Sequence, residues 1–116
     1  MTRPIVLRDL ISGGWEEAVF EPFRDGVTIH HILKGEPAIA LLRYQPGARV
    51  PRHRHAGLET IIVLEGTQID DNGAYPAGAM MANPEGSEHA VWSKTGCVVL
   101  IQWNKPVIIL EDEVQG

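Results

Sequence analysis

The sequence predicts an all-β fold of the sandwich or barrel type. Short apolar runs recur along the 116 residues and are separated by turn signals rich in glycine, proline, asparagine and aspartate. No segment has the long i, i+3, i+4, i+7 apolar spacing of an amphipathic helix. A composition of 44% hydrophobic and 22% charged residues, with 12 glycines and 8 prolines, is typical of a turn-rich globular chain. We therefore expect one domain, over residues 1–116, with a core of its own.

The expected elements follow one another at short intervals. Residues 4–12 allow one or two turns of helix before the first strand. Turns such as "RDG", "QPGA", "DDNG" and "NPEG" then separate strands expected at 17–20, 27–33, 38–44, 59–66, 78–82, 89–92, 97–103 and 106–110. The acidic, polar residues 111–116 are expected to form a solvated tail.

Two of these strands are apolar on both faces. In "TIIVL" and "VVLI", neighbouring positions point to opposite sides of a sheet and yet are all hydrophobic. Such strands must be covered on the outside as well as packed inside. Because a small barrel has little with which to cover its own outer face, we expect a homodimer.

Charge and composition exclude several classes of partner. The net charge of −5 does not favour binding to nucleic acid, even though three arginines cluster at 49–54. Neither a signal peptide nor an apolar run long enough for a membrane span is recognisable, so we expect a cytoplasmic protein that does not bind membranes. The single cysteine, Cys97, lies in "GCVVLIQW" and is expected to be a small buried hydrophobe rather than a reactive thiol.

Two histidines in "PRHRHAGLE" have the spacing of metal ligands. His53 and His55 are two residues apart, so on a strand both rings project to one face, with backbone positions about 7 Å apart. Glu59 has the same parity, but on a straight strand it would lie about 13 Å from His55, too far for a shared ion. The chain must therefore bend, and Gly57 is the natural position for a turn or bulge. The alternative is a polar strand end that resists aggregation.

Three other histidines could complete a metal site. His89 is the best candidate, because it follows the turn "NPEGSEH" that would carry a strand back across the barrel. His30 and His31 are adjacent and point to opposite faces of their strand, so at most one could face the interior. We expect both to be ordinary strand surface or satisfied core.

Candidates for contact with a bound substrate are less sharply marked. Arg49 shares the parity of the histidines and could neutralise a carboxylate or enolate at the mouth of the barrel, although Pro51 disturbs this parity. Arg52 and Arg54 alternate outward. Further candidates for the cavity wall or an interface, for each of which apolar packing is the ordinary alternative, are Tyr44, Met81, Trp92 and Trp103.

The spacing of these residues resembles the cupin family. Residues 47–66 match the first cupin motif in every interval, through Gly47, His53, His55, Glu59 and Gly66. Residues 78–93 match the second motif through Gly78, Pro84, Gly86 and His89, and depart from it at Ser93, where asparagine is usual. The short segment between the motifs resembles a compact hairpin. The amino-acid sequence also resembles that of the cupin domain in ChrR-type anti-sigma factors and their stand-alone relatives.

The resemblance implies a double-stranded β-helix, the jelly-roll barrel of cupins, commonly found as a dimer. It also implies one divalent metal ion per chain, bound by His53, His55, Glu59 and His89. Iron, manganese, nickel or zinc suits a set of three imidazoles and one carboxylate. The N-terminal zinc module that holds the sigma factor in ChrR-type proteins has no counterpart in this sequence, so anti-sigma activity by that route is not expected.

Two functions are open at this point. Some stand-alone relatives are iron dioxygenases, which implies a metal-dependent enzyme acting on a small chelating substrate such as a diketone or a hydroxylated aromatic ketone. Other relatives bind zinc without a known reaction, which implies a non-catalytic sensor of zinc or of a small ligand. No serine elbow, phosphate-binding glycine loop or positioned nucleophilic cysteine indicates a different chemistry.

Overall fold

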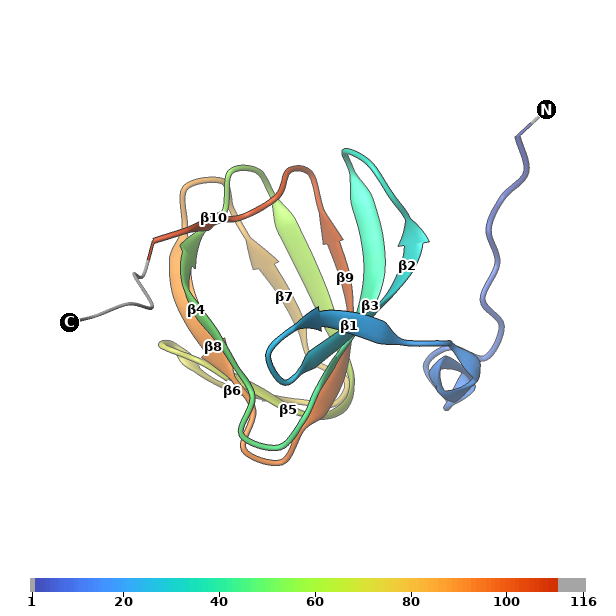
Figure 1. The fold of residues 1–116 in the computed structure, drawn as a ribbon, viewed down its shortest axis with the longest axis horizontal. Helices are drawn as coiled ribbons and strands as arrows, with labels where there is room; N and C mark the ends of the chain where they lie inside the picture. The colour runs from blue at the N-terminus through green and yellow to red at the C-terminus, as the bar shows by residue number, and fades with distance from the viewer. Residues whose placement is uncertain (1, 111–116) are drawn as a thin grey trace.

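The computed structural model describes residues 2–110, so the predicted tail at 111–116 lies outside the described residues. Within that range the chain curls into an open-ended barrel (Figure 1). No helix in this part of the chain is long and apolar enough to cross a membrane. A short 3-10 helix precedes ten strands: η1 (Gly14–Glu17), β1 (Glu21–Arg24), β2 (Val27–Leu33), β3 (Ala38–Tyr44), β4 (Arg49–Arg54), β5 (Glu59–Asp70), β6 (Gly73–Pro76), β7 (Met80–Asn83), β8 (Glu88–Trp92), β9 (Cys97–Trp103) and β10 (Ile108–Ile109).

The strands form one curled antiparallel sheet, in the order β1-β2-β3-β9-β5-β8-β4-β10, with β6 and β7 also paired to β5. The first part of β5 pairs with β9 and β7, and its last part pairs with β6 and β8. One long strand therefore belongs to both halves of the barrel, as Figure 1 shows at the base of the molecule. The predicted all-β barrel is confirmed.

A bend in β5 at Gly66 makes this sharing possible. Gly66 has a φ of 74°, and a Cβ atom at this position would lie only 2.1 Å from the carbonyl oxygen of Gly96. Any side chain would therefore collide with the neighbouring turn. The register with β9 shifts just before the bend, between Val63 and Glu65. This bulge turns the strand from one half of the barrel into the other.

Apolar side chains fill most of the barrel interior. They come from both halves of the barrel, which makes this a single continuous core. The buried members are Val27, Ile29, Ala40, Leu42, Tyr44, Ala48, Val50, Ile61, Val63, Val91, Cys97, Val99 and Ile101.

A second apolar cluster lies on the outer face of β3, β5 and β9. Trp15, Leu41, Leu64 and Val98 are buried there, and side chains of the N-terminal segment, among them Leu10, pack against them. The segment that precedes β1 therefore covers the outer face of the two strands that are apolar on both sides. The chain itself supplies the cover for which we expected a second copy, and the homodimer remains a prediction.

The N-terminal segment differs from expectation. The strand predicted at 17–20 is wrong, since η1 ends at Glu17 and the first strand is β1. In place of the predicted turn of helix at 4–12, residues 4–7 have no regular structure and residues 8–12 form turns. The apolar residues here serve the outer cluster, where Ala18 and Phe20 pack beside Trp15 without belonging to a strand. The apolar pattern at 17–20 correctly indicated partly buried side chains. It wrongly indicated the backbone hydrogen bonds of a strand.

Replacing Trp15 tests whether the N-terminal segment covers the sheet. Its side chain is 5% exposed, and the Arg43 guanidinium carbon lies 5.7 Å from its ring centroid. We expect Trp15→Ala to lower the free energy of unfolding by about 3 to 5 kcal/mol, because a large cavity would open. The control Val19→Ala, at a position that is 80% exposed, should change it by less than about 0.5 kcal/mol. Urea denaturation measures both, and equal losses would contradict the assignment.

Thiol labelling tests the burial of Cys97. The side chain is buried, and its removal from water raises the pKa of the thiol to about 11, although a contact with Ser93 opposes the rise. Because the thiol stays protonated and covered at pH 8, iodoacetamide should react with it only after unfolding in urea. Rapid alkylation of the folded protein would show that this part of the core is open.

Candidate metal centre

Three of the four predicted ligands meet at one end of the barrel interior. His53 on β4 faces His89 on β8 as a directly paired cross-strand neighbour, and His55 follows just beyond the end of β4. The three ring centroids are separated by 4.7 to 5.2 Å. One ring nitrogen from each lies within 4.8 Å of the others, and all three side chains are buried. The structure therefore brings together residues from both sequence motifs.

The turn before β8 fixes the position of His55. The His55 N–H donates to the carbonyl of Ser87 at 2.9 Å, and the Gly86 N–H donates to the carbonyl of His55 at 2.8 Å. The predicted bend between His55 and Glu59 is present. Gly57 does not owe its place to a left-handed φ. A Cβ there would lie 3.0 Å from the Cβ of Asn104, so the close approach of another segment favours glycine.

Hydrogen bonds select one tautomer at each of the three rings. The Nδ1 atom of His53 lies 2.8 Å from the Pro51 carbonyl, and that of His55 lies 3.0 Å from the Ser87 carbonyl. The Nδ1 atom of His89 lies 2.9 Å from Oδ2 of Asp70. Carbonyl and carboxylate oxygens only accept, so each Nδ1 carries the proton and each Nε2 presents a lone pair.

The Nε2 atoms have the surroundings of metal ligands. Those of His55 and His89 are buried and have no hydrogen-bond partner among residues 2–110. Converging buried lone pairs without donors are costly unless a cation receives them. The three histidines therefore fit one divalent metal ion, and the oxygens that accept from their Nδ1–H groups would hold the rings in place around it.

Asp70 is a functional residue that the sequence reasoning missed. Besides accepting from His89, its carboxylate accepts from the Asn72 N–H at 2.8 Å and from the Tyr75 hydroxyl at 3.0 Å, both on Oδ1. The motif "DDNG" indicated a turn, and that turn follows β5 directly. Alternation along β5 gave no signal, because the core residues Ile61 and Val63 have the opposite parity to Asp70 and Leu64 faces the outer cluster. The bulge between Val63 and Glu65 and the bend at Gly66 turn Asp70 to the interior.

Glu59 lies beside the three histidines. Its Oε1 atom is 3.2 Å from Nε2 of His55 and 3.2 Å from Nδ2 of Asn83, which donates to it. The side chain is buried and faces the cavity, but the group of converging nitrogens does not include it. Its assignment as the fourth ligand stays a prediction.

Burial and neighbouring groups shift the pKa values of two of these histidines in opposite directions. Burial lowers the pKa of His53, assisted by the nearby rings of His89 and His55, although the Pro51 carbonyl and Glu59 oppose the fall. Burial also acts to lower the pKa of His55, but contacts with Glu59 and Ser87 outweigh it, so the pKa of His55 is raised. Without a metal, His55 therefore retains its second proton to higher pH than His53, and a metal ion bound here would have to displace that proton.

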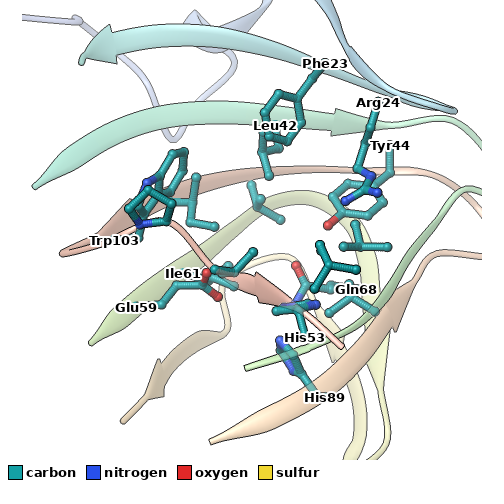
Figure 2. A pocket seen from close by; sticks show the side chains of 17 residues that line it. Phe23, Arg24, Leu42, Tyr44, His53, Glu59, Ile61, Gln68, His89 and Trp103 are labelled. Atoms are coloured by element: carbon teal, nitrogen blue, oxygen red, sulfur yellow. The ribbon is translucent and has the colours of Figure 1, made fainter. Parts of the chain in front are cut away.

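An apolar cavity of about 340 Å³ opens above the histidines (Figure 2). His53 and His89 lie on one side of it with Gln68 next to them, and Arg24 and Tyr44 approach from the opposite wall. Most of the remaining wall is hydrocarbon, and residues 106–109 of the C-terminal segment contribute to it. Such a cavity suits a small, largely apolar ligand.

Only some of the residues predicted to contact a substrate line the cavity. Tyr44 and Trp103 line the cavity, whereas Met81 packs against the core and is not part of the wall. Arg49 is exposed, because a bulge between Val50 and His53 breaks the parity from which it was predicted. Arg24, which the sequence reasoning did not single out, lines the cavity instead. Substrate contact by any of these residues stays a prediction.

The remaining basic residues lie outside the cavity, as expected. Arg52 and Arg54 point outward and pair with Asp71 and Glu88 across the outer surface of the barrel. His30 and His31 are partly exposed on β2 and contact the Val19 carbonyl and Glu21 respectively. Neither belongs to the group of three.

Known proteins are similar to this chain in sequence and have the same barrel fold. Residues 12–106 match the family described as the ChrR cupin-like domain. Over 107 residues the chain is 30% identical to the anti-sigma-E factor ChrR of Cereibacter sphaeroides, a match that covers 90% of this chain and 50% of that protein. The chain therefore spans half the length of this curated relative.

Solved structures agree on the fold. ChrR in its complex with Rhodobacter sphaeroides SigE superimposes with a TM-score of 0.72 and 26% identity, over 82% of this chain and 54% of that one. An acetylacetone dioxygenase from Acinetobacter johnsonii superimposes with a TM-score of 0.74 over 83% of this chain and 74% of that one, and its 15% identity shows the fold alone. The predicted cupin barrel is confirmed, and the chain belongs to the family of ChrR cupin-like domains.

Proposed function

We propose that this protein is a metal-dependent enzyme of the dioxygenase type, acting on a small chelating substrate such as a diketone or a hydroxylated aromatic ketone. The observation that carries the proposal is the convergence of three histidine Nε2 lone pairs at an apolar cavity of about 340 Å³. A site that only stabilises the fold needs no cavity of this size beside it. An acetylacetone dioxygenase has the same barrel fold, so the fold is compatible with this class of reaction.

In this proposal His53, His55 and His89 hold the metal, with Glu59 as the fourth ligand. An iron or manganese ion bound there supplies Lewis acidity toward a chelating ligand and can activate dioxygen. The hydrocarbon wall excludes water from the bound ligand. Burial, followed by the charges of Cys97 and Glu59, raises the pKa of Tyr44, so its hydroxyl keeps its proton and can donate a hydrogen bond.

A second function is favoured by a separate observation. The 30% identity to an anti-sigma factor extends over nearly all of this chain, which supports a non-catalytic sensor whose state another protein reads. In that case zinc or a small ligand would set the conformation of the barrel.

A homodimer and a cytoplasmic location belong to both versions of the proposal. Exposed apolar side chains such as Ile5, Val6 and Ile11 support an association between protein surfaces.

Metal content and oxygen uptake distinguish the two functions. Protein purified without an affinity tag or chelator should contain close to one iron or manganese per chain, and should consume oxygen only when a diketone or hydroxylated aromatic ketone is added. His89→Ala should abolish the uptake while the barrel stays folded, and the matched control His31→Ala should not.

Stoichiometric zinc without turnover on this panel would contradict the enzymatic function and support the sensor. Removal of that zinc should then lower the melting temperature or release a partner protein.

Replacing Asp70 tests whether its carboxylate supports metal binding through His89. Asp70→Asn removes the charge that holds His89 in its orientation, and we expect the affinity for zinc or iron to fall about 10- to 100-fold. The neighbouring Asp71→Asn is the matched control, because Asp71 pairs with Arg52 on the outer surface. Competition with a metal-binding dye gives both affinities. Equal affinities for the two variants would rule out the assigned role of Asp70.

A further inference from the structure

We propose that Gln68 is a positioning residue for the ligand, whose side-chain oxygen accepts a hydrogen bond from a hydroxyl or N–H group of a chelating molecule in the cavity. The site would then favour chelators that carry a donor group in addition to their chelating oxygens. This inference rests on the proposed function, because it assumes that a small molecule binds beside the metal.

The strand that holds the metal site also places Gln68. Gln68 and Asp70 are two residues apart on β5, so both side chains project to the interior face of the barrel. Asp70 orients His89, and Gln68 lines the cavity next to His53 (Figure 2). A ligand bound to the metal from the cavity therefore lies beside the Gln68 amide.

The amide of Gln68 is incompletely satisfied by the protein. Its side chain is 1% exposed. Nε2 donates only to the sulfur of Met81, at 3.8 Å, and sulfur is a weak acceptor. Oε1 is buried and has no hydrogen-bond partner among residues 2–110. Leaving such an acceptor unpaired is costly, and an apolar side chain of similar size would avoid that cost.

The chemistry of the unpaired atom defines the missing group. A carbonyl oxygen attracts a donor and repels a carboxylate, so the preferred partner is a phenol, an enol hydroxyl or an amine. The cavity wall also carries donor groups on Arg24 and Tyr44, but no residue in the described part of the chain bonds to Oε1. A simple diketone whose two oxygens are both used for chelation has no hydroxyl left, so it would leave Oε1 unpaired. Within the proposed substrate classes, Gln68 therefore favours hydroxylated aromatic ketones over diketones that lack a further hydroxyl.

Calorimetry with a related set of chelators tests the inference. The probes are ortho-hydroxyacetophenone and its positional isomers with a second ring hydroxyl, each added to the metal-loaded protein. At least one isomer should bind the natural protein about tenfold more tightly than the parent compound. Gln68→Leu should lose this advantage while binding the parent equally well or better. Gln102→Leu, the same change outside the cavity, should keep it.

Each pattern of binding has a distinct meaning. If the parent compound binds but no isomer exceeds it, or if the advantage survives in Gln68→Leu, the role of Gln68 is overturned while the ligand-binding function stands. If the metal-loaded protein binds neither the parent nor any isomer, the proposed function and the inference fail together.

Melting temperatures test the unpaired oxygen without any ligand. Gln68→Leu, or Gln68→Met if leucine packs poorly, should leave the melting temperature unchanged or raise it by a few degrees, because no protein hydrogen bond to Oε1 is lost. Gln102→Leu should lower it, since Gln102 accepts from Thr60 at 3.1 Å and donates to Asn104 at 2.6 Å. A clear decrease for both Gln68 variants would mean that the amide has a structural role, and would overturn the inference.

Discussion

The hydrogen bonds that the three histidine Nδ1–H groups donate are the constraint on which the candidate metal site depends. Each bond keeps a proton on Nδ1 and therefore leaves the Nε2 lone pair directed at a common point. The acceptors come from three different places in the fold: the backbone of β4 at Pro51, the turn before β8 at Ser87, and the end of β5 at Asp70. The tautomers are thus set by the closure of the barrel, and the site exists only when both halves have assembled.

That closure depends in turn on β5 and on the segments that cover the barrel. The bend at Gly66 lets β5 pair on one side with β9 and on the other with β8, which carries His89. The N-terminal segment seals the outer apolar face around Trp15, so the sheet can be apolar on both sides without another molecule. The interior nevertheless remains unfilled at the metal end, where residues 106–109 line the opening. A packed core and a ligand cavity therefore share one barrel.

The enzyme and the sensor use the same donor set, so the difference between them lies in the metal and in the contents of the cavity. A closed four-ligand site on zinc holds a conformation, whereas a six-coordinate metal leaves positions for a chelating ligand. The buried, unpaired oxygen of Gln68 is relevant to this choice. It adds a selective contact to a wall that is otherwise mostly hydrocarbon, and selective contacts are what a binding cavity needs and a purely structural site does not.

The sequence by itself determined most of the strands, the turns between them and the placing of two histidines on one face, because these follow from spacing over a few residues. The two spaced motifs also pointed to His89, far along the chain, through family resemblance. Only the tertiary structure decided that Asp70 supports His89, that Gln68 faces the cavity, and that a bulge near Pro51 turns Arg49 to the surface. These facts depend on register and pairing between strands distant in sequence. A single extra residue in one strand reverses the faces that local alternation predicts.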